Sequence, residues 1–221
     1  MQKTAQFTKY EYQKRPIEDM ILSSDEFYNK MLQRRTVREI SSQDIPIEII
    51  ENIIKTAGSA PSGANKQPWF FAVIQSTEMK TKIREICEHH EKINYETKYS
   101  EEMKQDLAFI QTDHVKEFLT EAPYLIIAFK VRYEENEEGK STHYYISESA
   151  GIALGMLFTA IHNSGLVTIP YTPMPRAFLR EILDLPHSYS PMVILPVGIP
   201  KENASVPLKS TKTLDKIMRI F

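Results

Sequence analysis

Three arginines stand within five residues in the segment Arg34-Arg35-Thr36-Val37-Arg38. A guanidinium presents a fixed fork of N–H donors that matches phosphate oxygens, so the cluster predicts a phosphorylated ligand. Taken alone, such a cluster is also typical of a solvated basic turn. The chain has only seven glycines and contains neither G-x-x-x-x-G-K-[ST] nor G-x-G-x-x-G. A phosphorylated cofactor would therefore be held by side-chain cations rather than by a glycine-rich loop.

A second polar segment, residues 60–69, reads Ala-Pro-Ser-Gly-Ala-Asn-Lys-Gln-Pro-Trp. Its small residues let backbone amides approach a ligand closely, and Asn65 and Gln67 add amide hydrogen-bonding groups. By composition alone the segment is a loop that precedes a strand. Together with the arginine cluster, it indicates a ligand site.

The two segments together resemble the FMN-binding signature of the nitroreductase family, R-R-[ST]-x-R followed by P-S-x-x-N-x-Q-P-W. The resemblance implies that the arginine cluster contacts the phosphate, the ribityl chain and the pyrimidine edge of FMN. It also implies contacts from the 60–69 segment, from residues before a Thr-Pro pair and from the C-terminal arm. The predicted FMN-binding residues are Arg34, Arg35, Thr36, Val37, Arg38, Pro61, Ser62, Asn65, Pro170, Tyr171, Thr172 and Lys212.

A charged stretch at residues 88–118 contains Glu91-Lys92-Ile93-Asn94-Tyr95 and, further on, Lys116. This pattern resembles the lid of the iodotyrosine dehalogenases, a branch of the nitroreductase family. A zwitterionic amino acid needs an acceptor for its ammonium (Glu91), a cation for its carboxylate (Lys116) and an adaptable donor (Tyr95). The resemblance implies that these residues hold a halotyrosine over the flavin, while the Ala64 amide hydrogen-bonds the phenolate. Alone, Glu91 or Lys116 would pass for a charge on a solvated helix.

The resemblance extends from about residue 30 to residue 218. Thr172 matches a threonine whose hydroxyl faces flavin N5, and it is the one catalytic residue that we predict. Pro170-Tyr171 replaces a run of hydroxyl residues, which adds an aromatic side chain near the flavin. Thr211 stands where the dehalogenases carry a phosphate-binding arginine, so Lys212 is predicted to bind the phosphate instead.

Hydrophobic and turn patterns predict a single α+β domain over residues 1–221, with a surface lid at about 88–118 and a C-terminal arm at about 201–221. The resemblance implies a nitroreductase-like fold, in which a central mixed β-sheet is flanked by helices, and an intertwined homodimer. The lid is expected to be poorly packed and mobile. The predicted helices cover residues 24–35, 44–58, 78–91, 103–119, 141–164, 176–185 and 214–218, and the predicted strands cover 69–75, 122–132, 166–172 and 191–198, with a charged loop at 134–140.

Composition excludes several classes of protein. Of 221 residues, 42% are hydrophobic and 25% are charged, and the formal net charge is −2. Such a balance argues against nucleic-acid binding, which needs a basic excess. A single cysteine, Cys87, is compatible with a reducing cytoplasm, and no signal peptide or membrane-length apolar run is present. We predict a cytoplasmic protein without a metal, because His89, His90 and Glu91 do not share a helix face.

The predicted function is FMN-dependent reductive dehalogenation of halotyrosines, with NAD(P)H or a separate reductase as the electron donor. Two alternatives stay open. The first is a general NAD(P)H-dependent nitro- or quinone reductase, because Asn65-Lys66-Gln67 is closer to the general nitroreductase form. The second is a non-catalytic flavin-binding sensor whose lid closes on a tyrosine-like ligand.

Overall fold

The computed structural model describes residues 7–137 and 139–221. The chain separates into two compact units, Met1–Arg34 and Arg35–Phe221. In the first unit, helix α1 (Ile17–Leu32) begins after Pro16, and Glu18 and Asp19 in its first turn suit the positive end of the helix dipole. The helix therefore begins earlier than the predicted residue 24. The prediction of one domain over the whole chain stays a prediction.

The second unit is built on an antiparallel sheet with the strand order β1-β2-β6-β5. Its strands are β1 (Trp69–Ile74), β2 (Tyr124–Val131), β5 (Val167–Thr168) and β6 (Tyr189–Gly198). An isolated parallel bridge joins Thr36 to Thr168 and makes the sheet mixed at its β5 edge. The arginine segment is thereby attached to the sheet.

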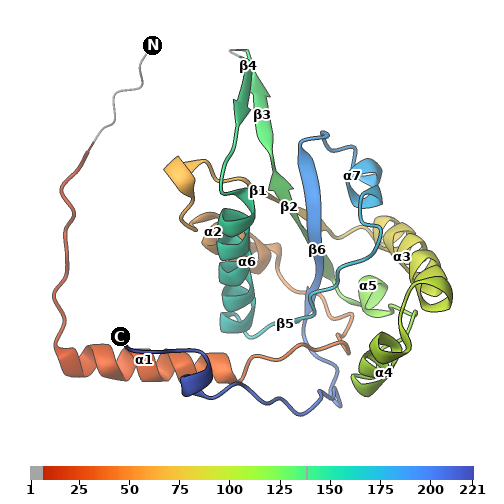
Figure 1. Ribbon diagram of the computed structural model, residues 1–221, viewed down its shortest axis with the longest axis horizontal. Helices are drawn as coiled ribbons and strands as arrows, with labels where there is room; N and C mark the ends of the chain where they lie inside the picture. Colours follow the sequence, from red (N-terminus) through yellow and green to blue (C-terminus); the bar gives the residue numbers. More distant parts are fainter. Residues whose placement is uncertain (1–6, 138) are drawn as a thin grey trace. The chain divides into compact units, whose positions relative to one another are not determined.

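Helices cover both faces of this sheet (Figure 1). Side chains alternate along β2, so that Leu125, Ile127 and Phe129 enter one core cluster while Ile126 and Ala128 enter the other. The first cluster packs against α3 (Thr77–Thr97), α5 (Phe118–Glu121) and α7 (Phe178–Ile182), and the second against α2 (Ile47–Gly58) and α6 (Ile146–Asn163). The predicted α+β class, with a central mixed sheet flanked by helices, is confirmed.

Several predicted segments differ in the structure. The helix predicted over 103–119 is interrupted after Phe109 and only Phe118–Glu121 is helical again. The charged loop at 134–140 and the first predicted turn of the next helix are instead a hairpin of β3 (Tyr133–Asn136) and β4 (Gly139–Thr142). Cross-strand pairing of these polar residues delays the start of α6 to Ile146. Helix α3 also continues six residues past its predicted end at Glu91, to Thr97, and α4 (Glu101–Phe109) then starts at an N-cap formed by Ser100.

Two short 3-10 turns complete the fold, η1 (Gly63–Asn65) in the predicted ligand loop and η2 (Leu214–Lys216) in the C-terminal arm. Within the described residues, no helix is both long enough and apolar enough to cross a membrane.

Candidate functional site

The arginine segment is held in an extended conformation beside β5. The Val37 amide donates to the Thr168 carbonyl at 3.2 Å, next to the Thr36–Thr168 bridge. The Arg35 guanidinium donates to the carbonyl of Pro207, where the C-terminal arm begins. Arg34 belongs to the other unit of the chain. The sheet edge therefore sets the position of Arg35, Thr36 and Arg38, and Arg35 ties this edge to the arm.

Arg38 has a buried donor with no partner. Its Nε atom is buried without a hydrogen bond, and so is the Thr168 hydroxyl. Burial lowers the pKa of the Arg38 guanidinium from its usual value. A buried polar group without a partner costs free energy, and an anionic ligand is the partner that a guanidinium matches best. The donor set therefore fits a phosphorylated or otherwise anionic cofactor.

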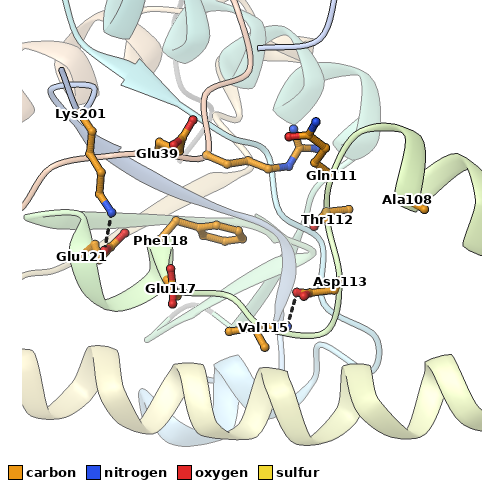
Figure 2. Close-up of a pocket in the computed structure, with 11 residues that line it drawn as sticks. Glu39, Ala108, Gln111, Thr112, Asp113, Val115, Glu117, Phe118, Glu121 and Lys201 are labelled. Atoms are coloured by element: carbon orange, nitrogen blue, oxygen red, sulfur yellow. Dashed lines mark hydrogen bonds and ion pairs between the residues drawn. The ribbon is translucent and has the colours of Figure 1, made fainter. Parts of the chain in front are cut away.

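Arg38 also lines a cavity of about 700 Å³ beside the segment that follows α4. Figure 2 shows the labelled side chains of this cavity, with Asp113 and Thr112 on the segment after α4 and Lys201 paired with Glu121 on the opposite side. A second cavity of about 390 Å³ shares Arg38 and adjoins Val206 and Pro207. The lining of the larger cavity consists of Arg38, Glu39, Ala108, Gln111, Thr112, Asp113, Val115, Glu117, Phe118, Glu121 and Lys201.

Most of the acidic groups around the larger cavity already have donors. Glu121 accepts from the Lys201 ammonium at 2.7 Å, and Glu39 accepts from the Ser205 amide at 2.7 Å. The Asp113 carboxylate accepts from the amide of Val115 at 2.8 Å. These bonds hold negative charge in place, and the Arg38 guanidinium keeps an unused N–H donor in the same region.

Helix α3 buries a stripe of mixed chemistry: Lys80, Ile83, Cys87, Glu91 and Asn94. Spacings of three and four residues place all five on one helix face. The Lys80 ammonium donates to the Ala122 carbonyl at 2.7 Å, and the Asn94 amide donates to the Met174 carbonyl at 2.7 Å. The prediction of a poorly packed lid is therefore wrong for this helix, because its polar side chains find buried partners. The same prediction fits α4, which has no buried residue.

Glu91 is only 6% exposed and is held by two tyrosine hydroxyls. Tyr171 donates to its Oε1 at 3.1 Å and Tyr99 donates to its Oε2 at 3.2 Å. Burial raises the pKa of Tyr171 far above its usual value, and burial together with the Glu91 charge raises that of Tyr99 to about 12. Both hydroxyls therefore stay protonated and able to donate at neutral pH.

Lys116 is 4% exposed, and its ammonium interacts electrostatically with the same carboxylate. Its ammonium donates to the Asp113 carbonyl and stands 5.7 Å from the centre of the Tyr171 ring. Its backbone amide donates to the Glu88 carboxylate at 2.7 Å. Burial lowers the pKa of the Lys116 ammonium, while the charges of Glu91 and Asp113 oppose that change. The nearby Arg38 charge lowers it further, so two cations face this region.

Tyr95 completes the predicted amino-acid clamp. Its hydroxyl donates to the Thr112 carbonyl at 3.2 Å, and its ring meets the Tyr99 ring edge-on at 5.1 Å. Burial and then the Glu91 charge raise the pKa of Tyr95. The structure thus brings Glu91, Tyr95 and Lys116 into one region next to Arg38. A carboxylate that accepts hydrogen bonds, a cation and a hydroxyl lie together, which is the set that a zwitterion requires.

The predicted ligand loop lies elsewhere. The Ser62 hydroxyl accepts from the Gln67 amide at 2.9 Å, and Ala64 and Asn65 adopt left-handed backbone angles, with φ of 46° and 55°. A side chain at Gly63 would come within 3.0 Å of the Tyr145 ring and 3.1 Å of the Tyr144 ring, so these rings would have to shift slightly to admit it. Across residues 7–137 and 139–221, no hydrogen bond or ion pair joins this loop to the arginine segment or to Glu91. No direct polar contact therefore joins the two halves of the predicted FMN site in the described part of the chain.

The remaining predicted residues lie on exposed segments. Pro170 and Thr172 are exposed on either side of the buried Tyr171, and Lys212 is exposed in the C-terminal arm. Pro61 is exposed at the start of the ligand loop. The described residues contain no group of three or more His, Cys, Asp or Glu side chains arranged to hold a metal ion.

Sequence reasoning missed Tyr99 and Asn94 and assigned Tyr171 to the flavin alone. The missed signal was periodicity: Ile83, Cys87, Glu91 and Asn94 continue one buried stripe, so a carboxylate at the third position needs interior donors. Tyr99 lies just past the end of the helix, and its hydroxyl reaches back to Glu91. The cavity residues Thr112 and Asp113 carried no signal, because their importance comes from the fold of the segment after α4.

The chain is similar to known proteins over most of its length. Residues 31–199 match the nitroreductase family. The chain is 44% identical over 205 residues to an iodotyrosine deiodinase of Haliscomenobacter hydrossis, covering 92% of each protein. It is 46% identical over 211 residues to an iodotyrosine deiodinase of Daphnia pulex, covering 95% of this chain and 70% of that protein.

A solved structure is similar as well. The crystal structure of oxidized iodotyrosine deiodinase bound to FMN and 3-iodo-L-tyrosine aligns with a TM-score of 0.75 at 31% identity, covering 85% of this chain and 97% of that one. The family match over residues 31–199 includes the sheet, both helical layers and the arginine segment.

Proposed function

This chain belongs to the nitroreductase family, and from that premise we propose that it is an FMN-dependent reductase that removes halide from halogenated tyrosines. The observation that carries the proposal is the meeting of Glu91, Tyr95 and Lys116 beside Arg38. A general reductase of nitroaromatics or quinones needs no buried pair of opposite charges beside its flavin. A ligand with both an ammonium and a carboxylate requires such a pair of charges.

FMN is the cofactor that the cationic segment fits. Arg35 and Arg38 would hold its charged and polar edge, and the unpartnered Arg38 Nε would gain an acceptor. Ser62, Asn65 and Lys212 are further proposed contacts, as is the hydroxyl of Thr172. When bound, FMN supplies the redox chemistry, accepting electrons from a donor and passing them to the substrate.

The chain's own residues bind and orient the substrate. Glu91 would accept the ammonium, Lys116 would pair with the carboxylate, and the Tyr95 hydroxyl would turn from Thr112 towards the ligand. The Ala64 amide would hydrogen-bond the phenolate and favour its ionised form. The net reaction replaces a carbon–halogen bond by a carbon–hydrogen bond, consumes two electrons and a proton, and releases halide.

We also propose a homodimer. Helix α6 leaves Ile152 47% exposed, and added side chains at Gly151 and Gly155 would meet open space. Such a face permits close approach of another helix. Within the described residues no hydrogen bond or ion pair joins the ligand loop to Arg38, which is consistent with a second copy supplying one half of the site. The C-terminal arm leaves Leu208 and Phe221 fully exposed.

The electron donor is proposed to be NAD(P)H, directly or through a separate reductase, and the compartment to be the cytoplasm. The proposed roles of Glu91 and Lys116 in substrate binding do not depend on the electron donor or on the compartment.

Anaerobic titration of the reduced, FMN-loaded protein tests the proposal. Iodotyrosine should reoxidise the flavin and release one iodide for each flavin consumed. A nitroaromatic and a quinone serve as comparisons under the same conditions. If both of these reoxidise the flavin and iodotyrosine does not, the protein is a general reductase. If iodotyrosine binds without any iodide release, it is a sensor.

A further inference from the structure

We propose that Tyr171 is a positioning residue that fixes the Glu91 carboxylate to the sheet before substrate arrives and so sets the preference for amino-acid substrates. The inference rests on the proposed function, because it concerns the acceptor for the substrate ammonium. The Tyr171 hydroxyl donates to Glu91 Oε1 at 3.1 Å, and both side chains are more than nine-tenths buried.

Tyr171 is anchored in the sheet rather than in the lid. Its amide donates to the Ile194 carbonyl at 2.9 Å, and its carbonyl accepts from the Ile194 amide at 2.8 Å. Ile194 is itself a fully buried residue of β6, the strand next to the central β2. The phenol ring therefore extends from a main chain that is hydrogen-bonded to the sheet and not to the lid.

The same side chain contacts both pieces of the lid. On α3, its hydroxyl donates to Glu91 and interacts with the nearby Cys87 thiol. On the other piece, its ring packs edge-on against Phe118 with centroids 5.7 Å apart, and the Lys116 ammonium lies 5.7 Å from the ring centre. Glu91, the predicted acceptor, and Lys116, the predicted cation, therefore both interact with the same side chain, Tyr171.

The geometry leaves Glu91 able to accept a further donor. A carboxylate offers about four lone-pair sites on its two oxygens, and the tyrosine bonds use one on each oxygen. Donors on opposite oxygens prevent the carboxylate from rotating, while unused lone pairs remain for an ammonium. A group held in its bound conformation loses less entropy on binding, so the clamp is preorganised.

Tyr99 and Tyr171 differ in what they attach Glu91 to. Tyr99 follows α3 directly, and its amide donates to the Asn94 carbonyl at 2.9 Å, so it moves with the lid. Tyr171 is the partner that joins Glu91 to the core. Loss of the Tyr171 hydroxyl should therefore release α3 from the sheet near Glu91, whereas loss of the Tyr99 hydroxyl should leave this connection in place.

Tyr171→Phe removes the hydroxyl and keeps the ring. Tyr124→Phe is the matched control, because Tyr124 is 2% exposed and its hydroxyl donates to the Ile45 carbonyl on the opposite face of the sheet. The first measurement is the ratio of kcat/KM for iodotyrosine to kcat/KM for its deaminated analogue, which keeps the ring and the carboxylate. The second is amide hydrogen exchange at residues 88–99 in the FMN-loaded protein without substrate.

In Tyr171→Phe, the ratio should fall roughly tenfold, as expected from the loss of one hydrogen bond to a charged group. Exchange at residues 88–99 should rise in the same variant. Tyr124→Phe should change neither. A Tyr171→Phe ratio that stays within twofold of wild type, or that rises, overturns the proposal. An inactive wild-type protein would instead overturn the proposed function, and the exchange measurement would still decide whether Tyr171 holds the lid.

Discussion

Glu91→Gln separates recognition of the ammonium from every other part of the site. Glutamine keeps the shape of the side chain and one carbonyl acceptor, while its NH₂ group can donate to a tyrosine hydroxyl. Charge reversal at this position is a poorer test than the sequence indicated. Glu91 is only 6% exposed and its charge interacts with Lys116, so a lysine there would bury a second cation and disrupt the fold.

The magnitude follows from the bond that changes. A hydrogen bond to a charged group contributes about 1.5–3 kcal/mol and one between neutral groups about 0.5–1.5 kcal/mol, so the variant should lose about 1–1.5 kcal/mol of binding free energy. That loss raises the Kd for iodotyrosine roughly five- to twelvefold. The low exposure of Glu91 limits screening by solvent, so the effect should persist in salt.

Binding is measured by flavin fluorescence with three ligands on FMN-loaded protein. Iodotyrosine and its decarboxylated analogue iodotyramine both carry the ammonium and should bind Glu91→Gln more weakly. The deaminated analogue lacks the ammonium and should bind as tightly as before. Thermal unfolding of the same samples controls for loss of structure. Equal weakening of all three ligands, or unchanged binding of iodotyrosine, would refute the assignment of Glu91 to the ammonium.

Three further predictions concern the cofactor, the cation and the assembly. Arg38→Gln should weaken FMN binding roughly tenfold or more, because a buried charge-assisted contact is worth about 1.5–3 kcal/mol, and equilibrium dialysis of FMN measures this; unchanged affinity would leave Arg38 as a structural residue. Burial lowers the pKa of Lys116, so its charge is lost as pH rises through that lowered value, and affinity for the deaminated analogue should fall at alkaline pH. Lys116→Arg stays charged and should extend binding to higher pH. Identical pH profiles for the two proteins would contradict the pairing of Lys116 with the carboxylate. Ile152→Glu should convert a homodimer to monomers that bind FMN weakly, as judged by sedimentation and flavin content, whereas a wild-type monomer with full flavin occupancy would exclude the interface.

Local sequence was sufficient for most of the elements. The isoleucines of α2 recur at helical spacing and three residues of that helix are buried, and the apolar run of β2 is buried almost throughout, as its composition predicted. The hairpin of β3 and β4 was missed because its strands are polar and pair only with each other. The full length of α3 was missed because Glu91 and Asn94 interrupt an apolar pattern that the helix nevertheless continues.

The candidate site was likewise predictable from the sequence only in part. The resemblance to the nitroreductase family and its dehalogenase branch singled out Arg35, Arg38, Glu91, Tyr95 and Lys116, whereas any one of these charged residues alone would have passed for a solvated surface group. The same resemblance also showed that Tyr171 departs from the pattern of the related proteins. The direction in which that side chain points was not accessible, since an aromatic residue beside a flavin segment gives no sign of which neighbour its hydroxyl meets.

The sequence by itself determined which chemical groups are available and on which elements they stand, because periodicity and motif spacing are local properties. Only the tertiary structure decided how they are paired. Tyr171 and Glu91 are 80 residues apart, and they form a buried hydrogen bond because β6 holds one while α3 packs the other onto the same face of the sheet. Such a pairing depends on the packing of distant elements, so no local pattern specifies it.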